Sequence, residues 1–435
     1  MTRLWRWAAV LAAGALASAT TGCATHAAPQ RDSVVPTIDL SGSRAEADVA
    51  YSPQPERSFI WVGANQADQF SDRQLERLAE HYDIVVLAKF HARYDIAAHH
   101  EAARRLVSLR PDVRVFPYFS MRYWFDKNRW GETILPEWLL RDAEGDLVER
   151  DDDEDREGGG AATFVDLANP DYRAWALDVL ASWLLEAPYA GVAFDAVAPL
   201  GEGDAESVAA WEERLGRERV AAYDRGLREL LAAAKDLVGP TRTIIYNGIA
   251  PNLAVRGEDR NLGLLELADA ALDERFCLDV DGSPHVLDED LDLLAGGPEG
   301  ELLMRTALPR SFSPGQAADL EAFCVGAFLV GWEPGRSYFQ AGRDYTAAQL
   351  DRAAPDLDVN LGLPLGPPVR EGEVVYRQFE RGLVVVNLGP DPAPVSVSEP
   401  VTQVRGGRVV GRHEPGSPIV VGVTDALYLL RGRVA

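Results

Sequence analysis

Two carboxylic acids end apolar runs of the sequence at positions where they could do acid–base chemistry. Asp195 follows Gly-Val-Ala-Phe at residues 191–194, and Glu274 follows Ala-Ala-Leu-Asp at residues 270–273. An unpaired carboxylate is costly to bury, so an acid in this position needs either a partner or a function. Two such acids are what glycoside hydrolysis requires, because one carboxyl protonates the leaving oxygen while the other attacks or activates water.

Both acids also have a structural interpretation. Asp195 could accept hydrogen bonds from backbone or arginine groups at the end of a strand. Glu274 could pair with Arg275, and Asp273 competes with Glu274 for the catalytic role. The surroundings decide between these interpretations, since a catalytic pair needs environments that separate the two pKa values.

Eight short apolar runs, alternating with helical patterns, must position these acids. The runs are residues 59–63, 84–90, 113–119, 191–197, 243–248, 270–277, 302–307 and 326–332. Between them, apolar residues recur at helical spacing in residues 71–82, 96–109, 170–185, 207–237 and 313–323. Such strands, apolar on both faces, indicate a parallel sheet, and eight units fit a closed (β/α)8 TIM barrel. An open doubly wound sheet is the alternative, but no Gly-rich phosphate-binding turn follows the first run.

After residue 358 the pattern changes to strands alone. Residues 374–379 and 383–387 flank a short turn that contains Gly382, which predicts a β-hairpin, and further alternating runs continue to residue 430. We therefore predict a barrel over residues 58–358 and a small all-β, sandwich-like domain over residues 359–435. This second domain is expected to cap and stabilise the barrel, with an independent sugar-binding module as the alternative.

The first residues have the features of an export signal. Arg3 and Arg6 form a short basic region, and residues 7–19 are apolar but too few to anchor the chain across a bilayer. Residues 20–23, Thr-Thr-Gly-Cys, resemble a bacterial lipobox.

We therefore predict a signal peptide with a lipobox over residues 1–23, lipid attachment at Cys23, and a flexible tether over residues 24–57. We expect the protein to be a membrane-anchored lipoprotein located outside the cytoplasm. Simple secretion is the alternative.

The charge and the cysteines exclude several classes of protein. A net charge of −25 argues against nucleic acid and other polyanions as partners. Cys277 and Cys324 are too few for a disulfide scaffold or a structural zinc site. We expect two buried free thiols, with a single bridge as the alternative. The histidines show no metal-ligand spacing, and the acidic run at residues 151–155 lacks the ligand spacing of a calcium loop, so we expect no metal and no cofactor.

Other side chains near the predicted strand ends are candidates for binding a sugar. An amide can donate to and accept from a hydroxyl, and aromatic rings stack on sugar rings. The alternatives are a turn position for Asn247, a helix start for the segment after Asp166, and burial in a loop core for Tyr118, Tyr123, Trp124 and Trp130. The substrate-binding candidates are Asn247, Asp166, Tyr118, Tyr123, Trp124, Trp130, Lys89, Trp61, Arg305 and Trp332.

Four segments together resemble a known family. They are residues 166–175, 191–195, 274–276 and 376–387. At these residues the chain resembles hypothetical glycosyl hydrolase family 15, a family of barrel glycoside hydrolases, and more distantly the endo-polygalactosaminidase and spherulin-like barrels. In the distant relatives an Asp on the fourth strand and a later Glu are taken as the catalytic pair. The resemblance therefore implies Asp195 and Glu274.

We predict a glycoside hydrolase that cleaves O-glycosyl bonds of an extracellular polysaccharide with Asp195 and Glu274, without a cofactor. The expected partner is the carbohydrate substrate. We expect a monomer that meets the membrane only through its lipid anchor. The alternative function is a non-catalytic glycan-binding barrel at the cell surface.

Overall fold

The structure is a computed structural model of the 435-residue chain. It describes residues 35–40, 57–63, 70–87, 96–125, 134–150, 162–201, 205–249, 260–279, 283–286, 288–297, 299–309, 311–342, 350 and 356–432.

Eight parallel strands form the central sheet. In order across the sheet they are β2 (Phe59–Val62), β3 (Ile84–Leu87), β4 (Arg114–Ser120), β8 (Gly191–Asp195), β9 (Thr243–Asn247), β10 (Ala270–Asp273), β11 (Glu301–Ala307) and β12 (Ser337–Gly342). A parallel bridge between Ser58 and Phe339 joins the two outer strands. The predicted (β/α)8 barrel is confirmed.

A side chain extends the seam between β12 and β2. The Trp61 backbone N–H donates to Gln340 Oε1 at 3.0 Å, and Gln340 Nε2 donates to the Trp61 carbonyl at 3.4 Å. The Gln340 amide thus pairs with β2 as a backbone amide of a neighbouring strand would. A strand at the edge of a sheet has backbone N–H and C=O groups without a neighbouring strand to pair with. By pairing with those of Trp61, the Gln340 amide helps to close the barrel.

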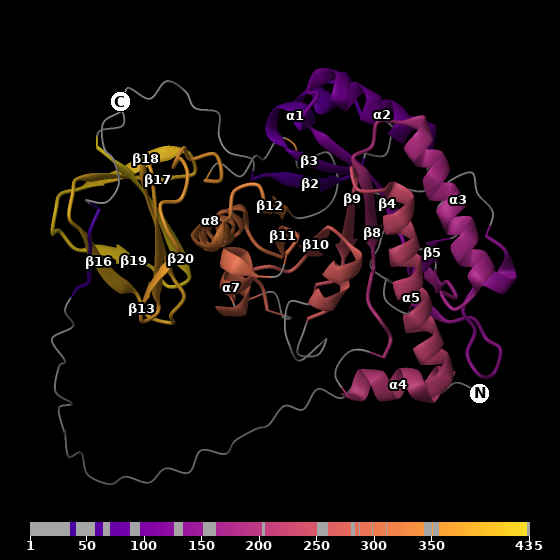
Figure 1. The fold of residues 1–435 in the computed structure, drawn as a ribbon. Helices are drawn as coiled ribbons and strands as arrows, with labels where there is room; N and C mark the ends of the chain where they lie inside the picture. The colour runs from indigo at the N-terminus through magenta and orange to yellow at the C-terminus, as the bar shows by residue number, and fades with distance from the viewer. Residues whose placement is uncertain are drawn as a thin grey trace, which may run out of the picture. The chain divides into compact units, whose positions relative to one another are not determined.

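Helices connect the strands. They are α1 (Asp72–His81), α2 (Ile96–Leu109), α3 (Pro170–Glu186), α4 (Ala205–Leu215), α5 (Arg217–Val238), α7 (Asp288–Gly296) and α8 (Pro314–Gly331), with 3-10 turns η1 (Pro136–Trp138) and η2 (Leu262–Leu267). Figure 1 shows α1, α2, α3 and α5 on the outer side of the strands that they connect. Their starts follow the sequence, since Ser71 and Ser313 form capping boxes and Asn169 caps a helix that begins with proline. None of the described helices has the length and apolar character needed to cross a bilayer.

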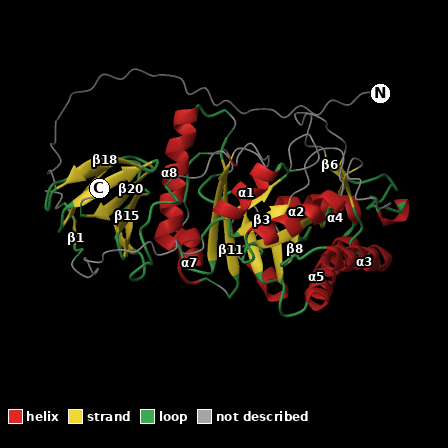
Figure 2. Ribbon diagram, turned by 90° about the horizontal axis from the view of Figure 1, so that it is seen from above, coloured by secondary structure: helices red, strands yellow, loops and turns green. Residues whose placement is uncertain are grey.

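The C-terminal domain contains two sheets. The larger has the order β13 (Val369–Glu371), β14 (Val374–Phe379), β15 (Gly382–Asn387), β20 (Asp425–Arg431), β17 (Val401–Arg405) and β18 (Arg408–His413). Leu383 and Val385 face the smaller sheet, and the alternate residues Val384 and Val386 join the core that contains the barrel. The predicted separate all-β domain is confirmed, and Figure 2 shows β15, β18 and β20 within it.

The smaller sheet includes a strand from the N-terminal part of the chain. Its order is β1 (Thr37–Ile38), β16 (Ala393–Val397) and β19 (Ile419–Val421), and β1 runs parallel to β16. Ile38 and Leu40 are buried in the core between the two sheets. Residues 35–40 belong to the stretch predicted as a tether, but here they are part of a folded domain.

The prediction of an eighth strand at residues 326–332 is wrong. Residues 326–331 are the last part of α8, Trp332 caps this helix, and the eighth strand is β12. Every residue from 322 to 331 is buried. A helix that is covered on all sides has no polar face, so its sequence reads as the continuous apolar run of a buried strand.

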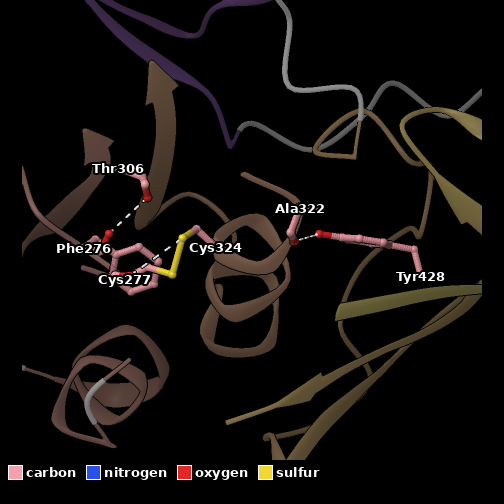
Figure 3. Close-up of a disulfide and its surroundings, with 6 residues drawn as sticks. All are labelled: Phe276, Cys277, Thr306, Ala322, Cys324 and Tyr428. Atoms are coloured by element: carbon pink, nitrogen blue, oxygen red, sulfur yellow. Dashed lines mark hydrogen bonds between the residues drawn. A yellow bond between two sulfur atoms is a disulfide. The ribbon is translucent and has the colours of Figure 1, made fainter. Parts of the chain in front are cut away.

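Helix α8 packs against both parts of the fold. On the barrel side, Phe328 packs on Phe339 of β12 with ring centroids 5.2 Å apart. On the other side, the Tyr428 hydroxyl of β20 donates to the Ala322 carbonyl (Figure 3). The helix therefore joins the barrel core to the larger C-terminal sheet.

The expectation of two free thiols is also wrong. Cys277, which follows β10, and Cys324 of α8 form a disulfide with Cα atoms 5.6 Å apart (Figure 3). The sequence separation of 47 residues gave no sign that the two cysteines would meet. The neighbouring positions of the β10 turn and α8 in the barrel bring them together.

Gly326 should show how tightly α8 packs on the C-terminal sheet. A Cβ atom at Gly326 would lie 2.4 Å from Ala426 Cβ, whereas a Cβ atom at Gly315 of the same helix meets nothing within 4 Å. Alanine favours a helix by roughly 0.5–1 kcal/mol over glycine, and overpacking costs about 1–3 kcal/mol. In urea unfolding we expect Gly326→Ala to lower the free energy of unfolding and Gly315→Ala to leave it unchanged or raise it. Equal stabilisation by both substitutions would contradict the packing.

Candidate active site

The Asp195 carboxylate lies at the carboxyl end of β8 and is held from both neighbouring strands. The Tyr118 hydroxyl of β4 donates to Asp195 Oδ2 at 2.6 Å, and Asn247 Nδ2 of β9 donates to Oδ1 at 2.8 Å. Tyr118 and Asn247 are buried, and Asp195 is half-buried. Within the described chain, both partners of this carboxylate are neutral. The structural interpretation with an arginine partner therefore does not hold for Asp195.

The backbone around Asp195 is tied to the same two strands. Met121 N–H donates to the Asp195 carbonyl at 3.0 Å, and Val197 N–H donates to the Asn247 carbonyl at 2.9 Å. Between them, Ala196 has φ 57°, a left-handed conformation that costs a non-glycine residue about 1–3 kcal/mol. Strain of this kind persists only where the surrounding contacts fix the backbone, as they do here.

Contacts link this site to the barrel seam. The rings of Trp61 and Tyr118 meet edge-on with centroids 5.6 Å apart. Trp61 is the residue whose backbone pairs with Gln340, and it is 2% exposed. The hydroxyl that holds Asp195 is thus supported by the strand that closes the barrel. This position makes Trp61 part of the wall beneath the site.

Strand register places Glu274 at the same edge as Asp195. Asn247 pairs with Leu272 of β10, and Glu274 comes two residues after Leu272. Glu274 is the first residue after β10, so it lies at the same carboxyl edge of the barrel as Asn247 and Asp195. Arg305 of β11 stands two residues after Leu303, the partner of Leu272, and therefore lies on the face of the sheet that Leu272 and Asn247 share. Arg305 is 2% exposed.

Asp273 points the other way and has a structural partner. Arg260 Nη2 donates to Asp273 Oδ2 at 3.2 Å, and Arg260 Nη1 donates to Asp290 Oδ1 of α7 at 2.6 Å. Asp273 is fully buried. Its competing claim to the catalytic role therefore fails. The sequence analysis missed Arg260 and Asp290, because no local pattern connects two residues that lie far from Asp273 in the chain.

The aromatic residues that follow β4 pack against one another. A small sheet of β5 (Tyr123–Phe125), β7 (Ala162–Phe164) and β6 (Glu149–Arg150) follows β4 in the chain. The Tyr123 ring lies 4.9 Å from the Phe164 ring, and the Trp124 ring lies 6.4 Å from Trp175 of α3. Tyr123 and Trp124 are half-buried in these contacts.

Arg122 connects this small sheet to the loop after Asp195. Its Nη2 donates to the Ala198 carbonyl at 2.7 Å, and its guanidinium lies over the Phe164 ring at 5.4 Å. Burial acts to lower the pKa of Arg122, but Tyr223 and Tyr123 outweigh it and raise that pKa above its usual value. Arg122 holds the loop through its hydrogen bond to the Ala198 carbonyl.

Two further candidates have other contacts. Asp166 Oδ2 accepts from Arg219 of α5 at 3.3 Å, and Asp166 Oδ1 accepts from Ala168 N–H at 3.1 Å. Trp332 is fully buried, donates to the Ser337 carbonyl at 3.2 Å and stacks on Phe379. Ser337 begins β12, so Trp332 lies at the amino end of the strand. The prediction that placed Trp332 at a carboxyl strand end is wrong, because it rested on a strand that is part of α8.

Lys89, Trp130 and Cys23 lie outside the described residues. In the part of the chain that the structure describes, no group of three or more His, Cys, Asp or Glu side chains could hold a metal ion.

Several solved structures are similar to this chain. The glycoside hydrolase domain of PelA from Pseudomonas aeruginosa is 19% identical, with a TM-score of 0.41, over 68% of this chain and 96% of that chain. The maltogenic α-amylase AmyB from Thermotoga neapolitana is 13% identical, with a TM-score of 0.47, over 86% and 98%. A GH27 β-L-arabinopyranosidase from Geobacillus stearothermophilus is 11% identical, with a TM-score of 0.43, over 88% and 97%. No curated protein sequence matches the chain.

One family model matches the sequence. It is described as hypothetical glycosyl hydrolase family 15, and it matches residues 111–383. This range is more than half of the chain and includes Asp195, Asn247 and Glu274. The chain therefore belongs to hypothetical glycosyl hydrolase family 15, the glycoside hydrolase family that its sequence resembles.

Proposed function

We propose that the chain hydrolyses glycosidic bonds of an extracellular polysaccharide, with Asp195 and Glu274 as the two carboxyl groups of the reaction. The observation that carries the proposal is the Asp195 carboxylate. It is held by two neutral donors, Tyr118 and Asn247, at the carboxyl end of a barrel strand. Active sites of such barrels lie at this end of the strands. A carboxylate whose partners among the described residues are both neutral suits a reaction whose transition state carries positive charge on the sugar.

The contacts of Asp195 favour one of the two catalytic roles. Both of its oxygens accept hydrogen bonds, so Asp195 is arranged as an acceptor and not as a proton donor. We assign it the role of nucleophile, or of the base that activates water. Glu274, at the same edge of the barrel two strands away, then has the role of the acid that protonates the leaving oxygen.

The remaining candidates supply binding in this proposal. Asn247 uses its amide nitrogen on Asp195, which leaves its amide oxygen as an acceptor for a sugar hydroxyl. Arg305 stands on the face of the sheet that Asn247 shares. Tyr123 and Trp124 belong to the small sheet that follows β4. The proposed reaction uses no metal and no organic cofactor.

The location of the enzyme rests on its first residues. Arg3 and Arg6, the apolar residues 7–19 and the cysteine at position 23 support export followed by lipid attachment at Cys23. Cys23→Ser should then move the protein from the membrane fraction to the soluble fraction of the producing cells. Unchanged fractionation would remove the lipid anchor from the proposal and leave secretion.

The two carboxyl groups are tested by amide substitutions. We expect Asp195→Asn and Glu274→Gln each to lower turnover by roughly 10²-fold or more, because a catalytic acid or base usually accelerates the reaction by at least this factor. The measurement is the release of reducing ends from a panel of extracellular polysaccharides. Thermal unfolding should change little, since an amide has nearly the same shape as a carboxyl group.

Two outcomes would contradict the proposal. Full turnover by either variant on a polysaccharide that the parent cleaves would refute the role of that residue. Tight binding of a polysaccharide by the parent without any release of reducing ends would identify a glycan-binding barrel. Asp319→Asn is a matched control, because Asp319 pairs with Arg405 on the surface, and it should keep the parent's turnover.

A further inference from the structure

A buried group of three charged side chains lies behind Glu274. Arg260 contacts both Asp273 and Asp290, and their side chains are 3%, 1% and 4% exposed. Arg260 itself has φ 54°, a left-handed conformation that is unusual for arginine. These residues come from three separate parts of the chain: the loop before η2, the end of β10 and helix α7.

Stability alone does not explain such a group. Charges lose their hydration when they are buried, and well-packed apolar residues in their place are often as stable or more stable. Buried ion pairs are, however, directional, and they fix the positions of the groups that they join. The question is therefore which group needs to be fixed here.

Asp273 is the residue directly before Glu274. Its Oδ1 accepts from Arg275 N–H at 2.8 Å. This hydrogen bond closes an Asx turn, and the Glu274 backbone is part of the closed ring. Its Oδ2 is held by Arg260 at 3.2 Å. The orientation of the Asp273 carboxylate thus sets the turn that carries Glu274.

The other end of this turn is also held. Thr306 Oγ1 of β11 donates to the Phe276 carbonyl at 3.1 Å, and the Cys277–Cys324 disulfide joins the next residue to α8 (Figure 3). The four residues from Glu274 to Cys277 are therefore fixed at both ends. The Asp273 end of the turn directly precedes Glu274.

We infer that Asp273 and Arg260 are positioning residues for Glu274, holding the acid at the distance from the sugar that proton transfer requires. The inference rests on the proposed function, in which Glu274 protonates the leaving oxygen. A shift of about 1 Å in a catalytic group can lower the rate by roughly 10²-fold. Loss of the Asp273 contacts should therefore resemble loss of the acid itself.

The leaving group of the substrate separates this role from a merely structural one. A phenyl leaving group needs protonation, whereas 2,4-dinitrophenolate leaves without it. The probes are the phenyl and 2,4-dinitrophenyl glycosides of the oligosaccharide that the parent releases from its polysaccharide. We expect Asp273→Ala to lower kcat/KM, which reports cleavage of the glycosidic bond, by roughly 10²-fold on the phenyl glycoside and by less than about threefold on the dinitrophenyl glycoside. Asp273→Asn keeps one acceptor oxygen and should fall between Asp273→Ala and the parent.

Two control variants complete the experiment. Val385→Ala, in the core between the two C-terminal sheets, lowers stability without touching the turn, and it should leave the ratio of the rates on the two glycosides unchanged. Equal losses on both glycosides, or no loss, in the Asp273 variants would overturn the inference. If Asp273→Ala fails to fold, Asp273→Asn decides.

Glu274→Gln should show the same leaving-group dependence. If Glu274→Gln keeps the parent's rates, the proposed function fails, whereas a leaving-group effect in Glu274→Gln alone would refute only the positioning role.

Discussion

The Asp195 carboxylate depends on the closure of the barrel. Its two donors come from the strands on either side, and one of them, Tyr118, packs against Trp61 on β2. Trp61 in turn is paired with the Gln340 side chain across the seam. An open sheet would leave Trp61 at an edge and Tyr118 without its support. The position of the Asp195 carboxylate thus depends on the closed barrel.

Helix α8 connects this barrel to the C-terminal domain. It contacts β12 on one side and the larger C-terminal sheet on the other, and its disulfide holds the turn after Glu274. The C-terminal domain therefore contacts the barrel through α8, and its stabilising role stays a prediction. Strand β1, which precedes the barrel in the chain, completes this domain. The first and the last described strands, β1 and β20, therefore both belong to the C-terminal domain.

Much of the fold could be predicted from the sequence, because apolar strands followed by capped helices leave a clear pattern. Asn169 before Pro170 marked the start of α3, and Asp195 marked the end of β8. The pattern failed where burial removed it: residues 322–331 of α8 are all buried, so residues 326–332 read as a strand and Trp332 was misplaced. The disulfide and the Arg260 group depend on contacts between distant residues, which no spacing reveals.

The most direct test of Asp195 is chemical rescue. Asp195→Ala removes the carboxylate and leaves space for a small anion, so sodium azide should restore turnover of a dinitrophenyl glycoside and give a glycosyl azide as product. The same addition should not restore an Asp195→Leu variant, whose side chain fills that space. A product without azide, or an Asp195→Ala variant as active as the parent without azide, would contradict the account of Asp195 as the carboxylate that faces the sugar.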